Sequence, residues 1–472
     1  MSNGVTGSDV RHGERGLDRR QFLKSLTLGG AAAASAIGLP GCSKVADDIE
    51  LNYALWPFGD EIVADNARVF TEQYGTKVAL QPTSGDYAAV METKLVSGTR
   101  LDLFRAQRGQ ASRWFAAQWI RPIDDMPDLD KIKREEFPAI GADALSWPDR
   151  KRIGLTYYNG GPYCLFRNEK VLSAGGYEAT ANPSDYPQTW DEIYKQAADL
   201  KKKGIVENPI LPSWFKSWTG TPWALYAHCA SEGDGLVDDD MKATFGLDTP
   251  ILKVLSDWKR WWDEELVPRA VLTWQEPQMA SSWMKGVHAF HCQSDYNSFA
   301  YSDPANGEFA RYFNMNPVMP GATHGTTLVG HALHVMSNTP RTDAELEAAF
   351  NLMKSFSWRD KNHELRMHKA WATLANLQVP FPEIYGDPKV KQAIMKWMYP
   401  PLANENYKWL FEGRQKAVAG NQLKAAWHQE WEVGMQQMVE DELLLKGTTT
   451  PKEVVLAIKN RWETLRSKYA KQ

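Results

Sequence analysis

The sequence places aromatic side chains next to hydrogen-bonding ones where apolar segments end. Trp56 ends one such segment, Asp86 and Tyr87 follow a second, and Arg105 with Gln107 ends a third. Aromatic ring faces suit the weakly apolar faces of a ligand, whereas carboxylates, amides and guanidinium groups suit a rim of hydroxyl groups. Carboxylates would also repel an anion, so the combination favours binding of a neutral polyhydroxyl compound.

Further residues of these types lie in irregular segments, interrupted by Gly or Pro, that are hard to bury as regular elements. The candidate ligand-binding residues are Trp56, Asp86, Tyr87, Arg105, Gln107, Tyr158, Trp218, Trp223, Trp274, Asp295, Tyr296, His331 and Trp371. Tryptophans on one stripe of a helix, namely Trp190, Trp258 and Trp262, are assigned to the core instead.

Two of these candidates have competing roles. Asp86 precedes a helix that starts at Tyr87 and could cap it. Arg105 could pair with a structural carboxylate, or it could face the ligand beside Arg108. In the latter case a phosphorylated or acidic ligand becomes an alternative.

The elements that position these residues alternate between strands and helices. Strands are predicted at 49–56, 76–84 and 101–107, and helices at 60–75 and 87–98. This order predicts a mostly parallel sheet covered by helices. Ligands bind beyond the carboxyl ends of such strands, which is where the first candidates lie.

The rest of the chain continues the α/β pattern and becomes richer in helix. Helices are predicted at 189–204, 251–265 and 343–358, and strands at 286–296 and 327–338. Capping boxes, in which each side chain satisfies the other residue's free N–H group, are predicted for Thr189 with Glu192 and for Thr450 with Glu453. The tail from Asp387 is predicted to be nearly all helical.

The amino terminus has the order of an export signal. Arg19 and Arg20 precede a short Ala/Gly-rich apolar run that ends at Cys42. The arginine pair resembles a twin-arginine motif and Leu39–Cys42 resembles a lipobox. We therefore expect residues 1–42 to be an export signal with its lipidation site, and the protein to be periplasmic or at the cell surface, anchored by lipid on Cys42.

Composition excludes several classes of protein. The formal net charge of −4 gives no basic face for a nucleic acid. Cys42 is assigned to lipid, so the other three of the four cysteines allow at most one disulfide. Histidines three apart in a strand point to opposite faces, which argues against a metal site. No cofactor is expected.

Several segments, in order, resemble the family 1 extracellular solute-binding proteins of ABC importers, a group that includes carbohydrate receptors. They are "IGLTYYNGGPYCLFRNEKVLSAGG" (153–176), "YPQTWDEIYKQAADLKKKGI" (186–205), "WMKGVHAFHCQSDY" (283–296), "PVMPG" (317–321), "LVGHALHVMSN" (328–338) and "GTTTPKEVVLAIKNRWETL" (447–465).

The resemblance implies a two-lobe, type II periplasmic-binding-protein-like α/β fold, with a helix-rich second lobe and the ligand cleft at the hinge. Lobe 1 would comprise 45–157 and 295–358, and lobe 2 would comprise 163–292 and 360–472. Crossings would lie near 158–161, 293–296 and 358–360. Gly160 and Gly161 suit a hinge because glycine tolerates backbone rotation.

The resemblance also implies the function. The protein would be a monomer that captures a sugar or polyol by lobe closure and delivers it to ABC permease subunits in the membrane, without being an enzyme. The alternative is a secreted carbohydrate-active enzyme, although the adjacent carboxylates Glu264–Glu265 and Asp238–Asp240 indicate solvated charge runs rather than a catalytic pair. An adhesin or scaffold would need neither a hinge nor an aromatic cleft.

Overall fold

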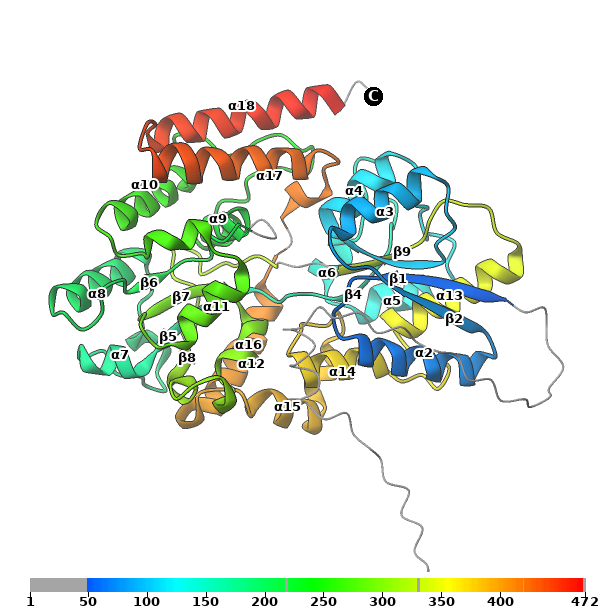
Figure 1. Cartoon of the computed structure of the whole chain (residues 1–472), viewed down its shortest axis with the longest axis horizontal. Coiled ribbons are helices and arrows are strands. Elements are labelled where there is room, and N and C mark those ends of the chain that lie inside the picture. The colour runs from blue at the N-terminus through cyan, green and yellow to red at the C-terminus, as the bar shows by residue number, and fades with distance from the viewer. Residues whose placement is uncertain (1–48, 217–219, 329–331, 419, 470–472) are drawn as a thin grey trace, which may run out of the picture.

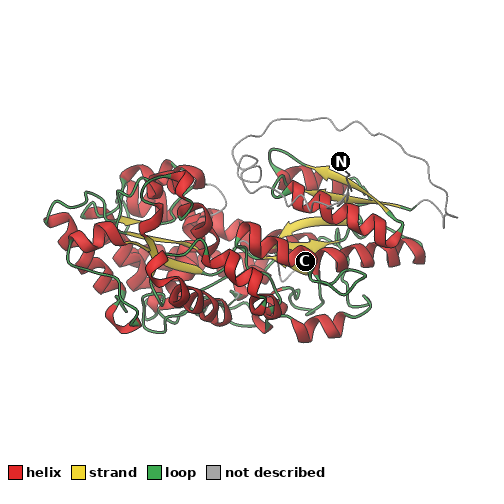
Figure 2. Cartoon of the chain, turned by 90° about the horizontal axis from the view of Figure 1, so that it is seen from below, coloured by secondary structure: helices red, strands yellow, loops and turns green. Residues whose placement is uncertain are grey.

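The computed structural model describes residues 49–216, 220–328, 332–418 and 420–469. Two sheets organise these residues, and they lie towards opposite ends of the long axis of the molecule (Figure 1 and Figure 2). We call the sheet of five strands and its helices the first body (50–158 and 332–375), and the sheet of four strands and its helices the second body (163–328 and 403–469).

The first sheet has the strand order β2-β1-β3-β9-β4. Strands β1, β2 and β3 are parallel, whereas β9 runs antiparallel to both β3 and β4. The strands are β1 (Glu50–Leu55), β2 (Lys77–Pro82), β3 (Leu103–Gln107), β4 (Leu155–Tyr158) and β9 (Ala332–Val335). The predicted β-α-β-α-β start is confirmed.

The helices of the first body cover both faces of this sheet. They are α2 (Asp60–Tyr74), α3 (Tyr87–Val96), α4 (Arg108–Ala116), α5 (Leu129–Glu135), α6 (Pro138–Asp143), α13 (Asp343–Ser357) and α14 (Arg366–Ala375). Alternation along β1 explains the two layers. Leu51, Tyr53 and Leu55 join one buried cluster, and Ala54 joins the other with Met91 of α3.

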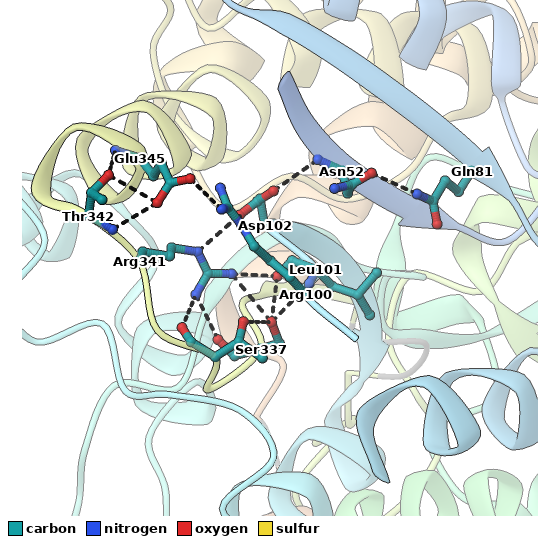
Figure 3. A network of polar contacts seen from close by, with 10 residues as sticks. Asn52, Gln81, Arg100, Leu101, Asp102, Ser337, Arg341, Thr342 and Glu345 are labelled. Carbon is teal, nitrogen blue, oxygen red and sulfur yellow. Dashed lines mark hydrogen bonds and ion pairs between the residues drawn. The ribbon is translucent and has the colours of Figure 1, made fainter. Parts of the chain in front are cut away.

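An ion-pair network fixes the amino end of β3 (Figure 3). The buried carboxylate of Asp102 accepts hydrogen bonds from Arg100 (2.8 Å), Arg341 (3.0 Å) and the backbone N–H of Asn52 (3.0 Å). Arg341 lies between β9 and α13, so this network ties the returning part of the chain to the first sheet. Arg100 also forms an ion pair with Glu345, so two carboxylates match the two arginines.

The second sheet has the order β6-β7-β5-β8. Its strands are β5 (Tyr163–Asn168), β6 (Ile210–Leu211), β7 (Phe290–Ser294) and β8 (Phe313–Met315). The sequence-based boundary assigned 295–358 to the first lobe, but β8 pairs with β5 in the second sheet. A short apolar strand has the same pattern in either sheet, so the sequence could not place it.

Helices surround the second sheet and form most of the second body. They are α7 (Glu169–Ala174), α8 (Trp190–Lys202), α9 (Gly220–Ser231), α10 (Pro250–Asp263), α11 (Glu276–Met284), α12 (Ser298–Tyr301), α16 (Ala403–Lys416), α17 (His428–Gln437) and α18 (Pro451–Tyr469). Helix α17 continues as a π-helix, Met438–Leu445.

Several local predictions for these helices are confirmed. Both capping boxes form, because Thr189 and Thr450 each exchange hydrogen bonds with the glutamate three residues later. The predicted core tryptophans Trp190, Trp258 and Trp262 are buried.

The predicted lobe 2 (360–472) would place α14 in the second body, but this helix lies in the first body. It packs against α2, α13 and β4 of the first body. Helix α15 (Pro388–Met395) contacts both α14 and α16, so the chain returns to the second body only after α14.

Backbone pairs join the segments that run between the bodies. Asn159 pairs with Gln378, Pro162 with Leu328, and Thr327 with Val418. Four stretches far apart in sequence are therefore paired with one another where the chain passes from one body to the other.

The sequence allowed at most one disulfide, and the structure shows Cys164, Cys229 and Cys292 as free thiols. The expected signal, with Arg19, Arg20 and Cys42, lies outside the described residues. Within the described part of the chain, no helix is long and apolar enough to span a bilayer.

Candidate functional site

Five candidate residues converge at the carboxyl ends of the first sheet. We call Trp56, Tyr87, Arg105, Tyr158 and Trp371 the first-sheet cluster. The ring of Trp56 meets that of Tyr87 edge-on at 5.2 Å, and its Nε1 donates to the Tyr158 hydroxyl at 3.2 Å. Tyr158 in turn packs against Trp371 with ring centroids 5.2 Å apart. The carboxyl-end rule therefore brought together residues from separate segments of the chain.

Arg105 is the charged centre of this cluster and is fully buried. Its Nη1 donates to the carbonyls of Trp56 (3.0 Å) and Phe58 (3.2 Å), and its Nε donates to the Tyr53 hydroxyl at 3.2 Å. The guanidinium also lies over the Trp56 ring, 5.4 Å from its centroid. It thus fixes the loop between β1 and α2, which carries the aromatic edge of the site.

No carboxylate forms an ion pair with Arg105 within the described ranges, and its Nη2 has no hydrogen-bond partner there. Partial burial raises the pKa of Asp60, and its carboxylate lies near enough to Arg105 for the guanidinium to oppose that rise. The positive charge at this strand end is therefore only partly matched by the protein.

A chain of uncharged hydrogen-bonding groups, Tyr53, His334 and Ser357, leads from Arg105 into the core of the first body. The Tyr53 hydroxyl lies 2.7 Å from Nε2 of His334, and Nδ1 of His334 lies 2.6 Å from the Ser357 hydroxyl. Burial, helped by the charge of Arg105, lowers the pKa of His334 well below its usual value. The imidazole is therefore neutral and adds no second charge beside the guanidinium.

Trp371 is fully buried, although it was predicted to contact ligand. It stacks on Phe58 at 5.6 Å with an interplanar angle of 7°, so it supports the half-buried ring of Phe58 from below. Gly59, with φ at 67°, permits this approach, because a Cβ there would overlap the indole ring. Sequence reasoning named the supporting ring and left Phe58 out of the site set.

Asp86 and Tyr87 take structural roles here. The Asp86 side chain accepts from the N–H of Ala89 at 3.1 Å and caps α3, which was the competing interpretation. Tyr87 is buried and donates to the carbonyl of Arg105 at 2.8 Å. Burial raises the pKa of Tyr87 well above its usual value.

Asp295 was expected to bind hydroxyl groups, but Arg414 occupies its carboxylate. Arg414 Nε donates to Oδ2 at 2.8 Å and Nη2 donates to Oδ1 at 3.2 Å, and both side chains are fully buried. The carboxylate also lies against Gly161, whose φ is 83° and where a Cβ would overlap it. The pair therefore lies at the passage between the bodies, beside the proposed hinge glycines.

The remaining candidate residues do not belong to the first-sheet cluster. Tyr296 donates to the carboxylate of Glu276, while Trp223 and Trp274 are half-buried in the second body. Within the described ranges, no hydrogen bond or ring contact joins these three to the first-sheet cluster. Trp218 and His331 lie outside the described residues.

Sequence reasoning missed the surface of the second body that faces α4. The Ser112 hydroxyl of α4 donates to the carbonyl of Leu423 at 2.9 Å. Trp147 of the first body meets Trp427 of the second edge-on at 5.7 Å. Gln107, half-buried, starts α4 at this edge and forms a capping box with Gln110. The two bodies thus meet beside the carboxyl end of β3.

His428 also lies on this surface, as the first residue of α17. A Cβ on Gly109 of α4 would lie 2.8 Å from Nδ1 of His428. Trp427 and His428 gave no signal in the sequence, since they belong to a long helical stretch with apolar residues on several faces.

This part of the molecule suits binding of a small polar ligand. Arg105 fixes the aromatic β1–α2 loop to the carboxyl end of β3, and α4, which starts directly after that strand, lies against His428 at the start of α17. Within the described residues, no group of three or more His, Cys, Asp or Glu side chains could hold a metal ion.

Comparison with curated proteins finds a relative in Agrobacterium fabrum (strain C58), the sn-glycerol-3-phosphate-binding periplasmic protein UgpB. It is 24% identical over 229 residues, which cover 45% of this chain and 50% of the relative. The match therefore spans about half the length of that protein.

Solved structures share the fold at low sequence identity. Maltose-bound MalE3 of T. maritima superimposes with a TM-score of 0.68 at 18% identity, covering 88% of this chain and 100% of that one. A substrate-binding protein of Listeria monocytogenes in complex with cycloalternan gives 0.67 at 17% (89% and 100%). A solute-binding protein of Agrobacterium vitis S4 with bound D-mannitol gives 0.63 at 15% (89% and 98%).

These neighbours establish the two-body fold that was expected, the type II arrangement of periplasmic sugar-binding proteins. The sequence profile of one family matches residues 57–355, which is more than half of the chain. The chain belongs to the bacterial extracellular solute-binding proteins.

Proposed function

We propose that this protein captures a neutral sugar or polyol between its two bodies and delivers it to the permease of an ABC importer. The observation that carries the proposal is the junction beside the carboxyl end of β3, where Trp147 packs on Trp427 and α4, which starts directly after Gln107, lies against His428 of α17. Three structural neighbours hold maltose, cycloalternan or D-mannitol, which supports this ligand class.

Capture would proceed by closure. A ligand bound to one body gains contacts with the other only when the bodies approach, so it shifts the population towards the closed form. The glycines at 160 and 161 would act as the hinge. The export signal would deliver the protein across the membrane, and lipid on Cys42 would keep it near its permease.

A second candidate ligand is a phosphorylated polyol. The charge of Arg105 is only partly matched, and the curated relative is named as a binder of sn-glycerol 3-phosphate. Arginine is a preferred partner of phosphate. The buried position of the guanidinium and its use in holding the β1–α2 loop favour the neutral ligand.

Calorimetry on protein lacking residues 1–42 tests the proposal, with maltose, D-mannitol and sn-glycerol 3-phosphate as probes. We expect saturable binding of maltose or D-mannitol, with a smaller radius of gyration in X-ray scattering when the ligand is bound. Native mass spectrometry of the purified protein checks for a co-purifying ligand. Binding of none of the probes, or conversion of a bound glycan to product, would overturn the proposal.

A further inference from the structure

His428 has one nitrogen engaged and one free. Its Nε2 lies 3.1 Å from Oε1 of Glu432 and 3.3 Å from the Tyr226 hydroxyl. Its Nδ1 has no hydrogen-bond partner within the described part of the chain. The side chain is only 2% exposed, so this free nitrogen is a buried polar atom that must be satisfied by something else.

The partners of Nε2 fix the position of the ring proton. The Tyr226 hydroxyl donates its single proton to Glu432 at 3.0 Å. The carboxylate can only accept, so the nitrogen facing both groups carries the hydrogen. In the neutral imidazole, Nδ1 then presents a lone pair and accepts a hydrogen bond.

The free nitrogen points out of the second body towards the first. Gly109, in the first turn of α4, is the residue against which Nδ1 lies, and a Cβ there would lie 2.8 Å away. Helix α4 starts at the carboxyl end of β3, directly after Gln107. Nδ1 is therefore directed at the junction where the proposed ligand would be held.

We propose that His428 contacts the ligand directly, with Nδ1 accepting a hydrogen bond from a hydroxyl group of a neutral sugar or polyol. Glu432 and Tyr226 are positioning residues that hold the ring and its proton. The inference rests on the proposed function and narrows it, since the group that meets Nδ1 must be a hydroxyl, whereas a phosphate dianion has no proton to donate there. Parting of the two bodies exposes the nitrogen, and ligand separates it from Gly109 on closure.

Three variants of His428 test this. His428→Phe keeps a ring but removes the acceptor, and His428→Gln places its amide near the position of Nε2. We expect both to weaken binding of maltose or D-mannitol at least about 10-fold, because a buried ligand hydroxyl loses its partner. His428→Asn places an amide oxygen near the position of Nδ1 and should retain most of the affinity.

The outcomes separate this inference from the proposed function. If wild type binds maltose or D-mannitol and all three variants bind it equally well, His428 does not contact ligand, and the proposed function stands. If wild type binds no probe, both fail. If only sn-glycerol 3-phosphate binds, and the three variants bind it as well as wild type does, the hydroxyl-accepting role is wrong.

A measurement without ligand covers the case in which His428→Phe does not fold. Two-bond ¹H–¹⁵N correlations of the wild-type protein report which ring nitrogen of His428 carries the proton. We expect hydrogen on Nε2. Hydrogen on Nδ1 alone would overturn the assignment of Nδ1 as the acceptor.

Discussion

Two buried arginines, Arg414 and Arg105, occupy contrasting positions. Arg414 lies at the passage between the bodies and forms a two-pronged ion pair with Asp295. Arg105 lies at the carboxyl end of the first sheet and is held by backbone carbonyls, a phenol and aromatic rings. Both side chains are fully buried.

The difference separates a structural site from the proposed binding edge. Where segments from different parts of the chain must meet, the protein supplies the opposite charge itself, as Asp102 also does for Arg341 (Figure 3). Where the strands end beside the other body, the charge has no ion-pair partner among the described residues. Charge pairing thus distinguishes two arginines that are equally buried.

The largest effect is expected at the paired site. Arg414→Met leaves the carboxylate of Asp295 buried without its partner, and should lower the free energy of unfolding by about 3–5 kcal/mol in urea titrations. The double variant Arg414→Met with Asp295→Asn should recover much of this loss. A loss below about 1 kcal/mol would show that the ion pair does not hold the passage together.

A smaller loss is expected at Arg105. Arg105→Met leaves only neutral acceptors, the carbonyls of Trp56 and Phe58, without their donor. The free energy of unfolding measured in urea titrations should therefore fall by about 2 kcal/mol. Affinity for maltose or D-mannitol should fall as well, because the β1–α2 loop is no longer fixed. Arg105→Lys serves as the control that keeps the charge and one hydrogen bond. A stability loss equal to that of Arg414→Met would remove the contrast.

The neutral chain behind Arg105 predicts a pH dependence. Burial lowers the pKa of His334 well below the unfolded value of 6.5, so the unfolded chain binds the proton more readily. The stabilisation is complete above pH 6.5 and is lost as the pH falls below it. His334→Gln should reduce the slope of unfolding free energy against pH by up to about 1.4 kcal/mol per unit.

Urea titrations at several acidic pH values measure this slope. Four other buried histidines (His228, His288, His291 and His368) also have a lowered pKa. The unfolding free energy of the variant should therefore still depend on pH, but with a smaller slope than that of wild type. Identical slopes would mean that His334 is charged beside Arg105 in the folded protein.

The smallest effect is expected at Asp86. Removing the cap of α3 with Asp86→Ala should cost about 1 kcal/mol in thermal unfolding, while Asp86→Asn should restore most of it. Calorimetry should give unchanged affinity for maltose and D-mannitol in both variants. A several-fold loss of affinity would return Asp86 to the ligand-binding set and extend the binding edge to α3.

The sequence predicted the first sheet well, because parallel strands end at one edge and their following residues must meet there. That rule alone gathered Trp56, Tyr87 and Arg105. It could not tell the half-buried ring of Phe58 from the fully buried ring of Trp371 that supports it, since the two differ in burial and not in aromatic character. The predicted boundary of the second body was wrong for a related reason, because the apolar pattern of β8 does not indicate which strand it pairs with.

The start of α17 was beyond sequence reasoning for another reason. The role of His428 depends on Glu432 one turn along the same helix and on Tyr226, which lies far earlier in the chain. Helical spacing predicts the first contact, but only the tertiary structure supplies the second. The direction in which Nδ1 of His428 points is also a tertiary property, because it is defined by Gly109 of the first body.

The place of β9 in the first sheet has a consequence for biogenesis. This strand separates β3 from β4 and is the strand through which β4 joins the sheet. A nascent chain that has emerged only as far as residue 158 holds β4 with no neighbour to pair with. Strands β1 to β3 can pair with one another, but the outer edge of β3 and the whole of β4 must wait for synthesis to pass residue 335. A ribosome that stalls midway would therefore release a product with an exposed strand edge that is prone to aggregate.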